Sequence, residues 1–297
     1  MKDLKNLTGL CKFLLLLTLA SYVSIGWGCS KENKNPAVEY GETELSRYDI
    51  KNKSPEIKKL IDHLREISGL TMTPDGRLFA HNDEKGRIFQ IDYGTGDVVK
   101  SFDVGDPVKA GDFEDIAYAN GMFYLINSKG ELYEFKEGED KQSVQFTKYE
   151  TGLNSRNDVE GLAYDPNTNS LLIACKGNPG KDVGYRKKAV YSFSLESKTL
   201  SEKPRFVIDL DKIGDKFSPS AIEYDPNSNT FFIIASEGNG ILEMTPEGEV
   251  INYMKLPGKV HIQPEGITFA PDKRLIISNE GRSGDGYIVI YDYMDKK

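Results

Sequence analysis

Three glutamates, Glu114, Glu160 and Glu265, are the residues whose type and spacing point most directly to chemistry. Each lies in a short sequence motif, here called a phrase, that begins an apolar segment. Ser68 and Ser220 occupy the same position in two further phrases. If the phrases are structurally equivalent, these side chains meet around one axis, where three carboxylates cannot all stay ionised without positive charge nearby. Calcium takes about six to eight oxygen ligands, readily from carboxylates, hydroxyls, amides and water. The pattern therefore predicts one calcium ion held mainly by the glutamates, with the serines as minor ligands.

Two asparagines, Asn127 and Asn279, are the other expected minor ligands, because their amide oxygens suit the same cation. A metal-free arrangement remains open beside this one. Lys176 follows the apolar segment next to Glu160 and can neutralise that carboxylate as an ion pair. In that case the other glutamates accept hydrogen bonds from backbone N–H groups or hold a proton.

Familiar motifs for other chemistry are missing from the sequence. His63, His81 and His261 are scattered and form no His-Glu-x-x-His pair, which argues against a zinc site. The turns that begin at Asp165 and Asp225 resemble the start of an EF-hand loop but lack its central glycine and final glutamate. No Gly-x-Ser-x-Gly phrase marks a nucleophile.

The spacing of the phrases indicates the elements that position these residues. Their middle residues, at 68, 114, 160, 220 and 265, lie 46, 46, 60 and 45 residues apart. Each phrase is followed by a turn, a second apolar segment, a polar corner and a third apolar segment. Short strands repeating about every 45 residues are typical of propeller blades. We therefore expect an all-β fold, a five-bladed β-propeller over residues 46–297, with six blades as the alternative.

Closure of this ring requires a strand from the N-terminal side, because the chain ends before a fourth strand of the last blade. Residues 46–50 are predicted to supply that strand. Apolar residues spaced three and four apart predict a short helix at 55–64. The long interval before the fourth phrase predicts a basic surface loop at 178–188.

The N-terminus resembles the signal of a bacterial lipoprotein. A weakly basic start is followed by an apolar run at 13–25, too short for the roughly 20 residues of a membrane span, and then by small residues before Cys29. This pattern predicts a signal peptide at 1–28, lipid on Cys29 and a polar tether at 29–45. The expected location is the bacterial cell envelope, with a lipid anchor in the outer membrane and the domain facing the periplasm or the cell surface.

The composition limits the class of partner. The chain carries 38 Lys and Arg against 46 Asp and Glu, a formal net charge of -8. Nucleic-acid binders normally present a basic face, so this balance argues against nucleic acid as a partner. A monomer is expected, with an unknown ligand or protein docked on the channel face.

The ordered series of phrases resembles the bacterial SdiA-regulated family, also called YjiK-like or CarP-like. The resemblance spans roughly residues 46–297 and rests on the phrases Ile67–Leu70, Val159–Tyr164, Ile233–Glu237 and Gln263–Ile267. It implies a five-bladed propeller with a bound calcium and no established enzymatic activity. Asp115 and Ala221 depart from the pattern, because glycine is expected at both positions.

Three functions remain as alternatives, one of which is a structural component of the envelope whose metal only holds the blades together. The first is a membrane-anchored, calcium-binding propeller that acts as a binding module at the cell envelope. The second is a metal-dependent hydrolase of esters, lactones or phosphoesters, in which calcium polarises an oxygen and His81 or His261 moves protons. The sequence offers no unmistakable nucleophile or base, which favours binding.

Overall fold

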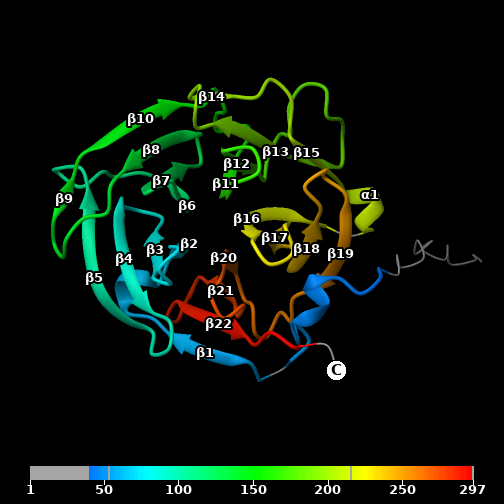
Figure 1. Cartoon of the computed structure of the whole chain (residues 1–297), viewed down its shortest axis with the longest axis horizontal. Coiled ribbons are helices and arrows are strands. Elements are labelled where there is room, and N and C mark those ends of the chain that lie inside the picture. The colour runs from blue at the N-terminus through cyan, green and yellow to red at the C-terminus, as the bar shows by residue number, and fades with distance from the viewer. Residues whose placement is uncertain (1–39, 53, 215, 296–297) are drawn as a thin grey trace, which may run out of the picture. The chain divides into compact units, whose positions relative to one another are not determined.

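The chain forms a ring of five antiparallel sheets around a central channel in a computed structural model that describes residues 40–52, 54–214 and 216–295 (Figure 1). The predicted all-β, five-bladed propeller is confirmed. Within the described residues no helix is long and apolar enough to cross a membrane. The predicted signal peptide and Cys29 lie outside the described residues, as does most of the tether.

Each blade contains four principal strands, written here from the channel outward. Blade 1 consists of β2 (Ile67–Met72), β3 (Leu78–Asn82), β4 (Arg87–Asp92) and β5 (Asp97–Val104), and blade 2 consists of β6 (Phe113–Ala119), β7 (Met122–Asn127), β8 (Glu131–Phe135) and β10 (Phe146–Glu150). Blade 3 consists of β11 (Val159–Asp165), β12 (Ser170–Cys175) and β13 (Lys187–Ser194), with β14 (Thr199–Leu200) and β15 (Phe206–Asp209) outside. Blade 4 consists of β16 (Ser218–Asp225), β17 (Thr230–Glu237), β18 (Gly240–Met244) and β19 (Val250–Lys255), and blade 5 consists of β20 (Pro264–Phe269), β21 (Leu275–Asn279), β22 (Tyr287–Tyr291) and β1 (Glu56–Lys59).

The hydrophobic core is divided into five clusters, one between each pair of neighbouring blades. Because every blade is covered on both faces, its second strand is mostly apolar rather than alternating. β12 is buried along its whole length, and Cys175 at its end is a buried thiol with no disulfide partner among the described residues. A buried thiol of this kind packs as a small apolar side chain.

An N-terminal strand does close the ring, but it is β1 rather than residues 46–50. β1 pairs antiparallel with β22, so that Ile57 lies opposite Val289. The strand expected at 46–50 is therefore wrong. Of the helix expected at 55–64 only the 3-10 turn η2 (Asp62–Leu64) is present, because residues 56–59 form β1. The apolar spacing that suggested a helix has another origin: Leu60 and Leu64 are buried after the strand turns inward, whereas Ile57 is 46% exposed on the outer edge.

Residues 44–50 instead pack over the core between blades 4 and 5. They begin with the short 3-10 helix η1 (Glu44–Arg47), whose Leu45 is fully buried. The Leu45 backbone N–H donates to Glu243 Oε2 at 2.8 Å. Tyr48 forms an isolated β-bridge with Tyr293, and both Tyr48 and Ile50 are buried.

Additional elements lie outside the repeating pattern of four strands. β9 (Ser143–Val144) adds a short parallel strand to the outside of blade 1. The long third interval holds the connection between β12 and β13, where Tyr185 is 92% exposed, as the predicted surface loop requires. It also holds β15 and the one-turn helix α1 (Leu210–Ile213), which the sequence did not indicate.

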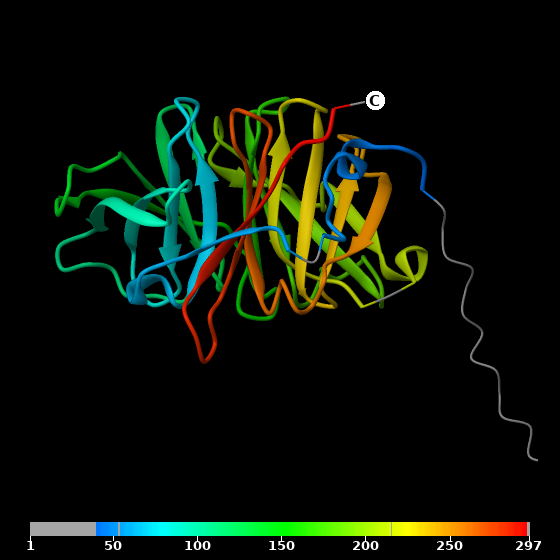
Figure 2. The same ribbon diagram turned by 90° about the horizontal axis from the view of Figure 1, so that it is seen from below.

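Two faces of the ring matter for function (Figure 2). The innermost strands all run in the same direction across the disc. We call the face where they begin the glutamate face and the face where they end the tyrosine face. In Figure 2 the C-terminus leaves on one side of the disc, and the loop between β21 and β22 projects from the other.

Candidate functional site

The glutamate face is built by irregular pairing at the start of every innermost strand. The register between the first and second strands shifts in every blade, for example between Val159 and Gly161 and between Phe113 and Asp115. Ser68, Glu114, Glu160, Ser220 and Glu265 all fall within these shifts. A bulge turns a side chain away from the regular ladder. The equivalence predicted from the five phrases thus has a structural basis that the sequence did not reveal.

Glycine follows the bulge where neighbouring innermost strands press together. A Cβ atom added at Gly161 would lie 3.1 Å from the backbone nitrogen of Ile222 in blade 4. One added at Gly266 would lie 2.9 Å from the backbone nitrogen of Leu70 in blade 1. The recurring glycine therefore allows close contact between blades.

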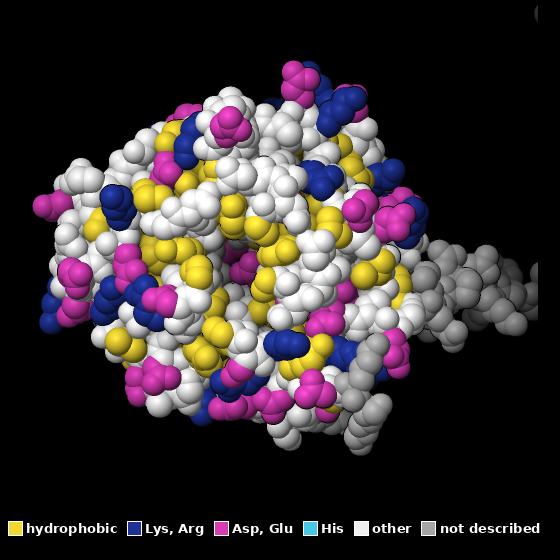
Figure 3. All heavy atoms as spheres, in the orientation of Figure 1, with side chains coloured by type: hydrophobic (Ala, Val, Ile, Leu, Met, Phe, Trp, Pro, Cys, Tyr) yellow, Lys and Arg dark blue, Asp and Glu magenta, His cyan; other side chains and the backbone are white. Residues whose placement is uncertain are grey.

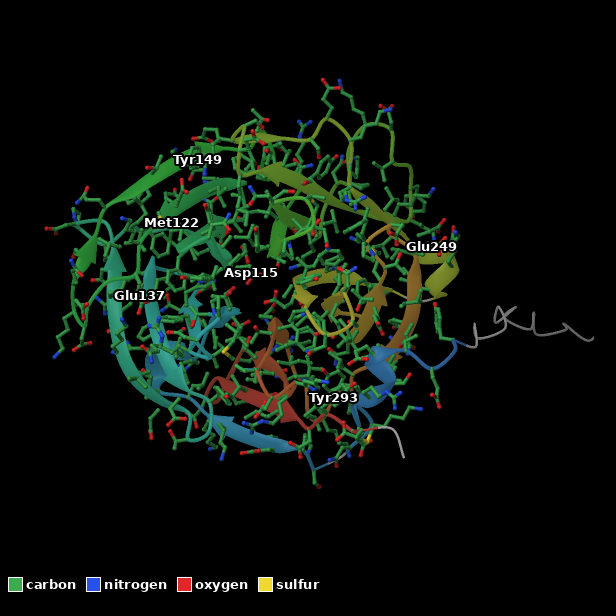
Figure 4. All side chains as sticks on the ribbon, in the orientation of Figure 1. Asp115, Met122, Glu137, Tyr149, Glu249 and Tyr293 are labelled. Atoms are coloured by element: carbon green, nitrogen blue, oxygen red, sulfur yellow. The ribbon has the colours of Figure 1, made fainter. Side chains whose placement is uncertain are left out.

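Asp115, which replaces this glycine in blade 2, links two innermost strands (Figure 4). The Leu162 backbone N–H donates to its Oδ2 at 2.7 Å, and the Ile116 N–H donates to its Oδ1 at 2.8 Å. Burial raises the pKa of this carboxyl well above its usual range despite both hydrogen bonds. Asp115, where the family pattern has glycine, thus connects blades 2 and 3 through its hydrogen bond to Leu162.

The three predicted glutamates form one electrostatic group. Burial raises the pKa of Glu114, and the charges of Glu160, Asp112 and Glu265 raise it further. Burial and the Glu160 charge likewise raise the pKa of Glu265 to about 8. These carboxylates therefore repel one another and favour protonation in the absence of a cation.

Lys176 neutralises one member of this group. Its Nζ lies 2.8 Å from Glu160 Oε1, and the Glu160 side chain is only 9% exposed. Burial still raises the pKa of Glu160, although the lysine opposes that shift. The lysine also lowers the pKa of Glu114 and Glu265 through its charge. This is the ion pair that the metal-free alternative anticipates.

A pre-formed carboxylate cage is not present. Among the described residues, no group of three or more His, Cys, Asp or Glu side chains is arranged to hold a metal ion. The donor chemistry suits calcium, since carboxylate oxygens gather at one mouth of the channel. Binding would require the carboxylates to move together and to give up their protons.

The predicted minor ligands are engaged elsewhere, with the exception of Ser68, which is buried at the start of β2. The Ser220 hydroxyl donates to the Pro264 carbonyl at 2.7 Å and links blades 4 and 5. The Asn127 amide donates to Glu131 Oε2 at 2.7 Å. Asn279 Oδ1 lies 3.2 Å from His261 Nδ1. In this conformation Asn127, Asn279 and Ser220 stabilise the scaffold.

A second acidic group lies beside the first at the ends of β3 and β21. Burial and the charges of Glu66, Glu280 and Glu84 raise the pKa of Asp83 to about 6. Asp83 Oδ1 is buried and has no hydrogen-bond partner among the described residues. The pKa of Glu280 is raised by burial and by the charge of Glu66. Unsatisfied carboxylate oxygen is thus a second sign that this face favours cations.

Both histidines proposed for acid–base chemistry are fully buried. His261 lies between Asn279 and Tyr291, with its Nε2 2.8 Å from the tyrosine hydroxyl. His81 Nδ1 lies 2.8 Å from the Asn82 carbonyl oxygen, and its Nε2 has no partner among the described residues. Burial lowers the pKa of each to about 4, so both rings are neutral at pH 7. Neither histidine reaches a substrate in this conformation.

Comparisons with known proteins agree with this architecture. The family model described as SdiA-regulated matches residues 44–214 and 197–293. No curated protein matches the chain in sequence.

Solved structures resemble the chain in fold. A glutaminyl cyclase from Myxococcus xanthus has a TM-score of 0.53 at 12% identity and covers 81% of this chain and 96% of its own. A gluconolactonase from Xanthomonas campestris has a TM-score of 0.51 at 11% identity, covering 76% and 72%. The PQQ-bound aldose sugar dehydrogenase from Streptomyces coelicolor has a TM-score of 0.50 at 14% identity, covering 81% and 99%. At these identities the likeness shows the fold alone.

Proposed function

Because the chain belongs to the SdiA-regulated family, we propose that it is a propeller of the bacterial cell envelope that binds calcium and acts as a binding module. The observation that carries this proposal is the set of partly or fully buried, mutually repelling carboxylates of Glu114, Glu160 and Glu265. An added cation relieves that repulsion. Without a bound cation, protonation of the carboxylates and the charge of Lys176 reduce the repulsion instead.

The residues that would hold calcium are the three glutamates, with Ser68 as an oxygen donor beside them. Glu114 and Glu265 have raised pKa values and would release protons on binding. Glu160 would exchange the Lys176 ammonium for the metal. Calcium takes about six to eight oxygen ligands, so hydroxyl, backbone and water oxygens would complete the set around the carboxylates.

The hydrolase alternative requires an acid–base group, and the two histidines named for that role are not accessible. Its two candidates, His81 and His261, are buried among strands of blades 1 and 5. A binding role requires no such group. The membrane anchor through Cys29 belongs to the same proposal and has its own test below.

Thermal melts with calcium and with a chelator test the proposal. A ligand at a hundredfold excess over its Kd that binds only the folded state stabilises it by about 2.7 kcal/mol. We expect Glu265→Gln to reduce this stabilisation, because it removes one carboxylate. Lys176→Met should increase it, because it removes the competing cation. The matched control is Glu249→Gln, an exposed residue on the outer edge of the ring (Figure 4), which should behave as wild type.

Identical melts with calcium and chelator for the wild-type protein would contradict the proposal. Equal calcium shifts in Glu265→Gln and Glu249→Gln would place the ion elsewhere. Calcium binding at unchanged strength in Lys176→Met would show that the lysine and the metal do not compete.

A further inference from the structure

The tyrosine face contains a cavity of about 380 Å³ at the other mouth of the channel. Figure 3 shows a central hollow bordered by hydrophobic side chains, with acidic atoms in its depth. The cavity is lined by residues from the ends of all five innermost strands and the turns that follow them. Its volume falls within the range of small-molecule sites, roughly 300 to 1,000 Å³.

Large apolar side chains occupy one equivalent position around this mouth, four residues after the bulge in each blade. They are Met72, Tyr118, Tyr164, Tyr224 and Phe269. Each packs against one of the five inter-blade clusters. The cavity therefore has four aromatic rings and one thioether in its wall.

The tyrosine rings are held in place by neighbouring groups. The Tyr164 hydroxyl donates to Asn169 Oδ1 at 3.1 Å, and the Tyr224 hydroxyl donates to Asn229 Oδ1 at 3.0 Å. Tyr118 packs edge-to-face on Phe123, with 4.9 Å between ring centroids. A fixed aromatic wall loses little conformational freedom when a ligand binds.

One acidic group lies within this wall. Glu223 lines the cavity, whereas the equivalent positions of the other blades carry Thr71, Ala117, Ala163 and Thr268. Its Oε1 accepts the Tyr224 backbone N–H at 2.9 Å, and its Oε2 accepts the Thr268 hydroxyl at 3.3 Å. Burial raises its pKa to about 8, and the described lining residues include no Lys, Arg or His to neutralise it.

We propose that this cavity, lined by Tyr118, Tyr164, Tyr224 and Phe269 around Glu223, binds a small organic cation with an alkylated ammonium head. Aromatic faces attract such cations, and more strongly where water is excluded. A bound cation favours the ionised form of Glu223, whose carboxylate then supplies the counter-charge. A metal ion fits poorly, because one carboxylate and apolar walls offer too few oxygens. An anion would be repelled by the same carboxylate.

Titration calorimetry with choline and with its neutral isostere 3,3-dimethylbutan-1-ol tests this site in the full domain at pH 8.5. The wild type should bind choline at least roughly tenfold more tightly than the isostere, because only choline carries the charge. Glu223→Gln should abolish that preference, and Tyr118→Leu should weaken choline binding roughly tenfold. Glu249→Gln is again the matched control. Circular dichroism melts verify that each variant is folded.

A flotation assay with phosphatidylcholine vesicles identifies the source of the head group. Flotation that depends on Glu223 indicates a lipid head group, whereas choline binding without flotation indicates a free solute. Equal binding of choline and its isostere, or unchanged choline affinity in folded Glu223→Gln, would overturn the proposal. So would the absence of choline binding at millimolar concentration. Loss of choline binding in folded Glu265→Gln, which leaves Glu223 intact, would move the cation site to the other mouth.

Discussion

At the scale of single residues, Lys176 is the group that keeps the glutamate face stable without a metal. Replacing it by methionine retains the apolar stem but leaves Glu160 buried without its cation. We expect Lys176→Met to lower the free energy of unfolding by about 2 kcal/mol in chelator, less than for a fully buried pair because the lysine is 34% exposed.

Urea denaturation of a double-mutant cycle measures this contribution. In the Glu160→Gln background the same lysine substitution should cost little, because no buried charge remains to be neutralised. An equal loss in both backgrounds would mean that Lys176 acts through packing alone.

The pH dependence of stability reports the unpaired carboxylates. Glu265 has its pKa raised from the usual 4.5 to about 8 by burial and by the Glu160 charge. Between these values the unfolded chain ionises while the folded protein keeps its proton. The free energy of unfolding therefore falls as pH rises through this window, by at most about 1.4 kcal/mol per pH unit for one group.

Glu265→Gln removes the contribution of this carboxyl to the pH dependence of stability. The melting temperature in chelator should therefore fall less steeply between pH 4.5 and 8 than in the wild type. Parallel profiles for the two proteins, measured by scanning calorimetry, would refute the raised pKa of Glu265.

The sequence identified the converging glutamates and the competing lysine, because both follow from residue type and repeat position. It did not identify the roles of Asn127, Asn279 and Ser220, because their contacts form only in the fold. Asn127 bonds Glu131 on the next strand, Asn279 contacts His261, and Ser220 bonds across to blade 5. Asp115 was noticed only as a departure from glycine. Its link to Leu162 depends on how two blades pack, which no local pattern records.

At the scale of elements, the N-terminal segment of residues 44–50 covers the core between blades 4 and 5. Leu45→Ala should lower the free energy of unfolding by about 3 kcal/mol, because it removes a fully buried side chain from this cluster. Val99→Ala is the matched control, since Val99 is 59% exposed on β5. Equal chemical-denaturation midpoints for the two variants would show that the segment does not stabilise the ring.

The strands of the five blades were predictable, because their turns and apolar runs repeat at a nearly constant spacing. The closing strand was not. Residues 46–50 and 56–59 are both short and partly apolar, and only pairing with the exposed edge of β22 distinguishes them. The bulges that aim the glutamates were also hidden, since register is set by contact between strands rather than by composition.

At the scale of the whole molecule, the two mouths of the channel differ in chemistry. One gathers ionisable carboxylates and the other an aromatic wall around a single glutamate. A lipid anchor would hold this ring at a membrane surface. We expect metabolic labelling with a fatty acid to mark the wild-type protein and Cys11→Ser equally, and to fail with Cys29→Ser. Labelling of Cys29→Ser at the wild-type level would exclude the anchor.

Proton release on calcium binding tests the central claim most directly. Calorimetric titration at pH 7.5 in two buffers of different ionisation enthalpy gives the number of protons displaced for each calcium bound. Because the pKa values of Glu114 and Glu265 lie above their usual range, binding at these carboxylates should release about one proton or more. Calcium binding with no proton release, or no calcium binding in either buffer, would contradict the account.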